Sequence, residues 1–302
     1  MKHPLIPMRS ILAGLILLIS AAGISGQTPV VPVRSEPAIL YRISGNKLTK
    51  PSYVFGTIHL VCPADMFRSE TLNGYLGQTQ QLMLELNLKD PEVMQQVAKA
   101  SVLPDGKTVK DYLKPGEYAK IDAVFKDYVG MSYEPLKAIK PSLVTVLLFR
   151  SPKVIGCDRA TAYDSVLADA AVSKGLPIYG LETVQDEMSA IDSQSIEKQV
   201  SDLSKTAADP EAAIGSFKRL YRAYLDQNSD DLYTLASNAG AANADLMSRL
   251  LRIRNAAWIP VIEKNITAKP TFIGVGSAHL GGDEGIIKLL RAKGYTLTPI
   301  RL

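Results

Sequence analysis

The sequence contains little histidine and little cysteine, with 3 residues of the first type and 2 of the second among 302. No Cys-x-x-Cys pair occurs, which argues against a zinc site built from paired cysteines. No Gly-x-Ser-x-Gly motif occurs either, which argues against the nucleophile elbow of a serine hydrolase. A P-loop is absent, and the glycines of residues 274–282 do not follow the Gly-x-Gly-x-x-Gly spacing of a dinucleotide-binding loop. The sequence therefore gives little support to a serine nucleophile or a nucleotide-binding loop.

Strong charge of either sign is also missing. The formal net charge is +4, and the basic residues are scattered without interleaved aromatic residues. This pattern predicts no nucleic-acid partner. An apolar content of 46% with 21% charged residues is typical of a globular chain that can bury a substantial core.

Long apolar runs are absent except near the start of the chain. The run over residues 11–24, "ILAGLILLISAAGI", follows the basic residues Lys2, His3 and Arg9 and precedes small residues. It is short for a membrane span, so we interpret residues 1–26 as a signal peptide, with an uncleaved anchor as the alternative. The Pro-rich residues 27–37 are interpreted as a linker. We therefore expect a secreted or periplasmic protein with no membrane span after signal removal.

The two cysteines, Cys62 and Cys157, are interpreted in the light of export. An even count in an oxidising compartment permits one disulfide. Two thiolate metal ligands are the alternative, which we disfavour because neither cysteine belongs to a Cys-x-x-Cys pair. A disulfide at Cys62 would tether the loop that carries His59.

Strand-like and helix-like segments alternate along the chain. Strands are predicted over residues 38–45, within 48–60 as a hairpin partner, and over 81–88, 176–182, 270–277 and 295–302. Amphipathic helix dominates residues 184–264. The pattern predicts an α/β or α+β fold: one domain over residues 38–302, in which helices and a helical middle region flank a mixed central sheet.

A Gly-x-x-His motif occurs twice, at residues 56–59 and 276–279, each time after an apolar strand. Gly56 and Gly276 lack a Cβ, so backbone or ligand can approach closely. Loops beyond strand ends are where α/β sheets form their sites. His59 and His279 together are a plausible half of a metal site, and packed core histidines are the alternative.

Carboxylates and one arginine are candidates for the rest of the site. Glu85 lies within the apolar "LMLELNL", and Glu182 ends "LPIYGLE", where a helix N-cap is the alternative. Asp283 and Glu284 are interpreted as acids at a helix N-terminus. Arg254 precedes an apolar stretch and is expected to face the sheet, whereas the arginines at positions 249 and 252 are expected on a solvated face.

These motifs resemble the TraB/PrgY/GumN family, which is similar to the TIKI metalloproteases. The resemblance covers residues 38–302 and rests on the following stretches: "GTIH", "LELN", "GLETVQDE", "RIRN" and "GSAHLGGDEGIIKLLRAKGY". It implies a compact α/β fold, two histidines close together and a peptidase-like divalent-metal site. By motif, the resemblance implies the site residues His59, Glu85, Arg254 and His279, with Glu182 in addition. The chain departs from the pattern at Glu187, where relatives commonly have Gln.

The leading hypothesis is a metal-dependent hydrolase that acts on a peptide or small-molecule substrate. His59, His279, Glu85 and Glu182 would bind zinc, manganese or cobalt. Glu85 would complete the ligand set or act as general base, and Arg254 would stabilise an oxyanion or orient Glu85. One alternative is a non-catalytic envelope protein that binds a metal, haem or a peptide. Another is a purely structural protein with both histidines in its core.

Overall fold

The computed structural model describes residues 38–239 and 244–302. The expected signal peptide and linker lie outside these residues. The strands are β1 (Leu40–Gly45), β2 (Ser52–Thr57), β3 (Gln81–Leu84), β4 (Ile178–Gly180), β5 (Thr271–Gly276) and β6 (Tyr295–Ile300). They form one six-stranded sheet in the order β4-β3-β5-β2-β1-β6.

The sheet is mixed, as the sequence predicted. Strands β4, β3, β5 and β2 pair in parallel, while β1 pairs antiparallel with both β2 and β6. The predicted hairpin of β1 and β2 is confirmed, and its turn uses left-handed backbone at Gly45, Asn46 and Lys47. The buried strand expected over residues 81–88 is shorter than predicted, because β3 ends at Leu84. Glu85 therefore follows the strand instead of lying inside it.

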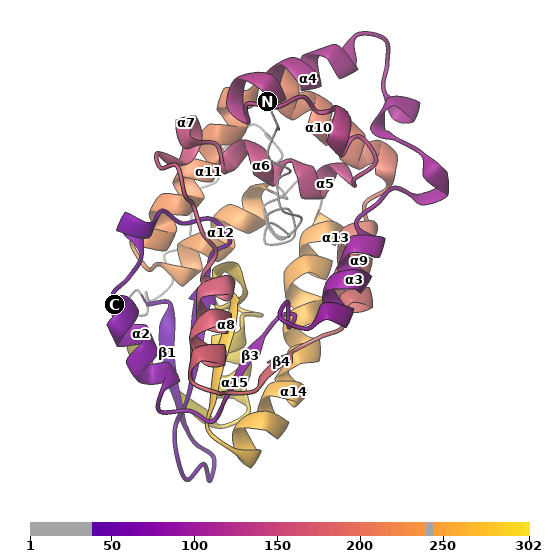
Figure 1. The fold of residues 1–302 in the computed structure, drawn as a ribbon. Helices are drawn as coiled ribbons and strands as arrows, with labels where there is room; N and C mark the ends of the chain where they lie inside the picture. Colours follow the sequence, from indigo (N-terminus) through magenta and orange to yellow (C-terminus); the bar gives the residue numbers. More distant parts are fainter. Residues whose placement is uncertain (1–37, 240–243) are drawn as a thin grey trace.

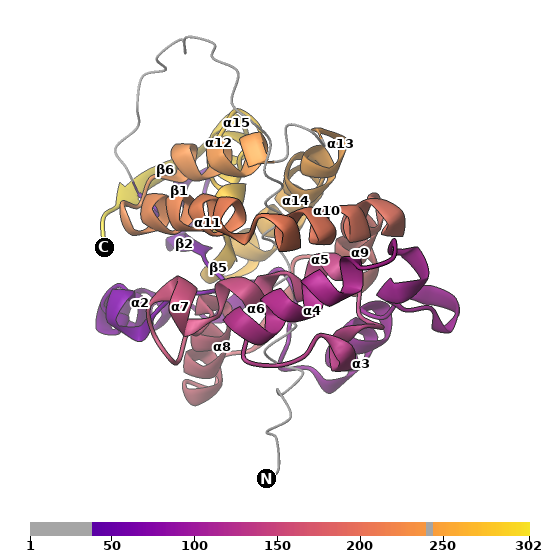
Figure 2. The same ribbon diagram turned by 90° about the horizontal axis from the view of Figure 1, so that it is seen from above.

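Helices cover both faces of the sheet. In the view from above, α2 (Ser69–Leu76) and α8 (Tyr163–Ser173) lie on one face, and α12 (Ser229–Ala239), α14 (Arg254–Ala268) and α15 (Ile286–Ala292) lie on the other (Figure 2). The core between these layers includes Phe55, Phe272 and Trp258, all nearly inaccessible to solvent. Burial of such large side chains is the main stabilising contribution to the fold.

A helical layer lies above the sheet in Figure 1. It comprises α3 (Pro91–Ala100), α4 (Glu117–Tyr128), α5 (Pro141–Val144), α6 (Val146–Phe149), α7 (Pro152–Ile155), α9 (Val184–Asp192), α10 (Ile196–Ala208), α11 (Pro210–Leu225) and α13 (Ala244–Met247). Proline at the start of α3, α5, α7 and α11 fixes where these helices begin. Leu60 packs with α6 and α7, and Leu86 packs with α5 and α9, so the loops after β2 and β3 lie beneath this layer.

The predicted disulfide between Cys62 and Cys157 is present, with the two Cα atoms 5.9 Å apart. A bridge between Val61 and Thr161 lies beside it. Together they join the loop after β2 to the segment that leads into α8. Among the described residues, no helix has the length and apolar character needed to cross a membrane.

Candidate functional site

Four side chains predicted to form the site follow four adjacent parallel strands. Glu85 comes directly after β3, Glu182 follows β4, His59 follows β2, and His279 ends a short 3-10 turn after β5. Because the carboxyl ends of parallel strands meet at one edge of a sheet, the chain delivers these side chains to a single region. Arg254 reaches the same region as the first residue of α14.

Arg254 lies at the centre of the acidic residues and is 4% exposed. Its Nε donates to the two oxygens of Glu182 at 3.0 and 3.1 Å, and its Nη2 donates to Glu85 at 2.6 Å and also to Glu182. Its Nη1 donates to the Leu250 carbonyl at 3.1 Å and faces His279 Nε2 at 3.4 Å. All five N–H groups of the guanidinium are therefore directed at acceptors. Because all of its donors are used, Arg254 is suited to orienting the side chains around it.

The backbone just before Arg254 is unusual. Residues Ser248–Ile253 form a π-helical segment that runs directly into α14. Such segments are rare and frequently occur at functional sites. Within it, Arg249 and Arg252 are exposed and pair with Asp245 and Glu284, so the predicted solvated face is confirmed.

The tautomer of His279 follows from its partner Asn255. The Asn255 amide nitrogen donates to the carbonyls of His279 and Glu284, so its oxygen must accept a hydrogen bond from His279 Nδ1, 2.6 Å away. Nε2 is then unprotonated and faces Arg254 and Glu85. Burial lowers the pKa of His279 to about 3, with Arg254 adding to the effect and Glu85 opposing it. The ring is therefore neutral at physiological pH.

Glu85 is held between the backbone and Arg254. One oxygen accepts a hydrogen bond from the Gly276 amide at 2.6 Å, and the other accepts from Arg254. A Cβ on Gly276 would lie 3.2 Å from the Glu85 oxygen, so glycine leaves room for this contact. Burial acts in the opposite direction, but the charge of Arg254 lowers the pKa of Glu85 to about 2. Glu85 is therefore a fixed carboxylate.

Glu182 is not a helix N-cap. Thr183 caps α9 through a capping box with Asp186. The Glu182 side chain is 5% exposed and accepts hydrogen bonds from Arg254 and from the Trp258 indole, 3.2 Å away. Both of its oxygens are thus held by α14.

His59 is paired on one side only. Its Nδ1 lies 3.0 Å from Asp164 on α8, and Thr57 donates to the other oxygen of the same carboxylate at 2.9 Å. Burial opposes protonation, but the charge and hydrogen bond of Asp164 raise the pKa of His59 to about 9, with Glu85 and Glu187 adding to the rise. The Nε2 atom is buried and has no hydrogen-bond partner in the described part of the chain. Of the two histidines, only His59 therefore has a ring nitrogen left without a protein partner.

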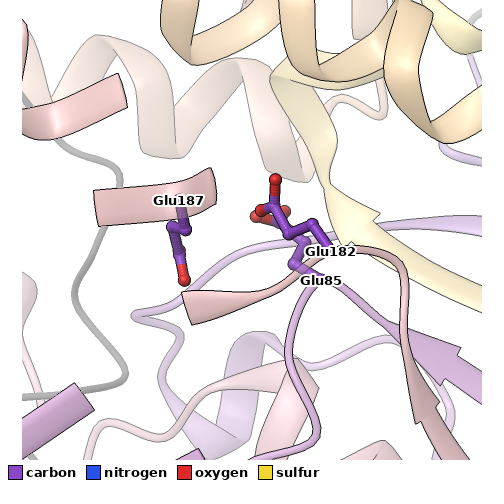
Figure 3. Close-up of side chains that lie close together, drawn as sticks. All are labelled: Glu85, Glu182 and Glu187. Atoms are coloured by element: carbon purple, nitrogen blue, oxygen red, sulfur yellow. The ribbon is translucent and has the colours of Figure 1, made fainter. Parts of the chain in front are cut away.

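The sequence interpretation missed Glu187 as a site residue. This side chain enters from α9, opposite Glu85 and Glu182 at the strand ends (Figure 3), and is 5% exposed. Its Oε1 lies 3.9 Å from Arg254 Nη2, and its buried Oε2 has no hydrogen-bond partner within residues 38–239 and 244–302. Burial raises the pKa of Glu187 to about 8. Glu187 is thus the least engaged of the three acids.

A signal for the two missed acids was present in the sequence. Glu187 shares one helical face with Val184, Met188 and Ile191, all buried. Asp164 likewise occurs three, four and seven residues before buried apolar residues of α8. An acid on the apolar face of an amphipathic helix indicates a buried, functional or paired carboxylate.

The prediction for Asp283 and Glu284 was wrong. Helix α15 begins at Ile286 after the N-cap Gly285, so neither acid lies in its first turn. Asp283 pairs with Lys288 on the surface, and the Glu284 side chain pairs with Arg252 at 3.7 Å. Neither is among the groups that contact Arg254.

The donor set is compatible with a cation. Oxygens of Glu85, Glu182 and Glu187 lie within 4.8 Å of one another, close enough to bind one metal ion. Arg254 contacts all three acids. Imidazole nitrogen and carboxylate oxygen are the donors that zinc, manganese and cobalt sites use.

Comparison with known proteins gives one result. The model of the TraB/PrgY/gumN family matches residues 39–299. Searches among curated proteins and among solved structures return no match. Since the match spans nearly all of the described residues, this chain belongs to the TraB/PrgY/gumN family.

Proposed function

We propose that this protein is a secreted or periplasmic metal-dependent hydrolase that acts on peptides. The observation that carries the proposal is His59: its Nδ1 is fixed by Asp164, and its Nε2 is buried and has no hydrogen-bond partner among the described residues. A histidine held in this way by a carboxylate is the usual arrangement of a metal ligand.

The charge balance supports a cation. Three acids, Glu85, Glu182 and Glu187, adjoin the one permanent positive charge of Arg254, while the charge of Asp164 is matched by His59. Unpaired buried carboxylates are costly, and a divalent ion would offset them. When bound, such an ion would act as a Lewis acid on the scissile carbonyl.

The residues of the chain have separate roles in this proposal. His59 would bind the ion through its Nε2, which is unpartnered among the described residues, and Glu85 through a lone pair beside its hydrogen bonds, whereas His279 would bind through Nε2 by exchanging its contact with Arg254 Nη1 for the ion. Glu182 and Arg254 are positioning residues, because each is saturated by the other and by their immediate neighbours. The disulfide supports an oxidising compartment, in line with the proposed signal peptide.

The test is elemental analysis of the purified mature chain beside a His59→Ala, His279→Ala double variant. The proposal predicts a stoichiometric divalent metal in the first and its loss in the second. Equal metal content in both would contradict the site. A peptide-library cleavage assay with added zinc, manganese or cobalt then separates a hydrolase from a binding protein. Metal binding without any cleavage would favour the binder.

A further inference from the structure

We propose that Glu187 is a ligand of the divalent cation, away from the contacts that Arg254 makes with Glu85 and Glu182, and that Arg254 stays in place when the cation binds. This inference rests on the metal site of the proposed function but not on turnover. It adds a residue that the sequence motifs did not supply.

The three acids around Arg254 are not equivalent. Both oxygens of Glu85 and both oxygens of Glu182 accept hydrogen bonds from Arg254, from the Gly276 amide or from the Trp258 indole. Glu187 has only a 3.9 Å contact between Oε1 and Arg254, and its Oε2 has no hydrogen-bond partner in the described part of the chain. Of the three, Glu187 therefore has the most coordination capacity left.

The position between Glu85 and Glu182 is closed to a second cation. Arg254 Nη2 donates to both carboxylates there. An ion entering that position would break charge-assisted hydrogen bonds and place two positive charges side by side in a buried region. A cation is therefore expected on the side that the guanidinium leaves free, which is the side of Glu187.

His59 offers a second buried atom that has no hydrogen-bond partner within the described ranges. Because Asp164 is bound at Nδ1, the ring directs Nε2 away from α8, and that atom is buried without a partner among the residues described. A cation that bound His59 Nε2 as well as Glu187 would satisfy two buried polar atoms at once.

Glu187 is also presented by a rigid element. The capping box of Thr183 and Asp186 fixes the start of α9, and Lys140 binds Asp192 at its end with N–O distances of 2.6 and 2.8 Å. A ligand on such a helix costs little ordering on binding.

The test is cobalt binding to the mature chain, followed by equilibrium dialysis and by the visible absorption spectrum of bound Co²⁺. Glu187→Gln is expected to weaken cobalt binding by about tenfold or more and to change the spectrum, since one oxygen ligand is lost. Glu197→Gln, the same change at an exposed position of α10, is the matched control and should bind as the wild type does. Circular dichroism establishes that each variant is folded. If Glu187→Gln does not fold, Glu187→Asp takes its place, with weaker binding again expected.

The outcomes separate this inference from the proposed function. Unchanged cobalt affinity and spectrum in the folded Glu187 variant, with binding lost in His59→Ala, would overturn the role of Glu187 and leave the metal site standing. No cobalt binding by the wild type would overturn both. Cobalt binding that depends on Glu187, without cleavage of any peptide, would support the inference and contradict the hydrolase.

Discussion

His59 and Asp164 form a pair that joins two elements of the fold. The imidazole Nδ1 lies 3.0 Å from the carboxylate, and Thr57 donates to the second oxygen of Asp164. The pair connects the loop after β2 to α8, and it determines which nitrogen of His59 is left for a ligand. Asp164 is therefore a positioning residue for the proposed site.

Asp164→Asn should weaken divalent-metal binding by roughly 10- to 100-fold, the effect usual for a residue that orients a metal-binding histidine. Equilibrium dialysis with zinc or cobalt measures it. Asp169→Asn is the matched control, since Asp169 lies on the same helix with its side chain 69% exposed. Equal loss of affinity in both variants would show that the effect is not specific to His59.

The same pair should make the stability of the metal-free protein depend on pH. The folded-state pKa of His59 is about 9, above the ordinary value of 6.5. The pair therefore stabilises the fold fully below about pH 6.5, and this contribution is lost as the pH rises through about 9. Urea unfolding in the presence of a chelator should give a wild-type advantage over Asp164→Asn that shrinks between these two pH values. An advantage that grows with pH would contradict the assignment.

Removal of the disulfide should act on both stability and the site. Cys62 and Cys157 are 95 residues apart in sequence, and a loop of that size predicts a loss of about 2–5 kcal/mol of unfolding free energy on reduction. The disulfide joins the segment just after His59 to the segment just before Asp164. Its removal should therefore loosen this pair and weaken metal binding as well. Denaturant unfolding with and without dithiothreitol measures the first effect. The Cys62→Ser, Cys157→Ser variant should not respond to the reductant.

Arg254→Met should be among the most destabilising single changes. It leaves the buried carboxylates Glu85 and Glu182 without their cation, at a cost of about 3–5 kcal/mol. Adding Glu182→Gln should recover part of that cost, because one buried charge is removed together with its partner. Arg252→Met, at a half-exposed position of the same helical run, should change stability by less than about 0.5 kcal/mol. Denaturant unfolding measures these free energies. If the losses caused by Arg254→Met and by Glu182→Gln simply add in the double variant, the two residues are not coupled and the prediction is contradicted.

The two Gly-x-x-His loops pack against each other through Gly56. A Cβ at this position would lie 2.8 Å from Leu280 Cδ1 and 3.0 Å from the Ser277 Cα. Because one of these is backbone, Gly56→Ala should cost about 1–3 kcal/mol. Gly74→Ala in α2 meets nothing within 4 Å and should be neutral or slightly stabilising. Thermal unfolding of the two variants provides the comparison.

Much of the fold was predictable because its signals are local. Alternation of apolar residues located the strands and the β1–β2 hairpin. The strand order was not predictable, because the pairing of β2 with β5 joins residues more than 200 positions apart. The exact end of β3 also escaped prediction, since Leu86 continues the apolar run after the strand has ended.

The candidate side chains at the strand ends and Arg254 were predictable, whereas the acids on α8 and α9 were not. Glu85, Glu182, Arg254, His279 and His59 were expected together. The structure places the first four in contact through Arg254, whereas His59 pairs with Asp164. Asp164 and Glu187 were not predicted, because a single acid in an amphipathic helix resembles a surface residue until the buried face of the helix is known. Whether these two acids line the site depends on which helices pack above the strand ends, and only the tertiary structure determines that packing.

The most direct test of the central claim is an anomalous diffraction map of crystals of the mature protein containing cobalt, recorded at the cobalt edge. The account predicts a peak at about 2.1 Å from His59 Nε2, with Nδ1 still bound to Asp164. Cobalt located only at other sites, with His59 Nε2 bonded to a protein acceptor, would contradict it.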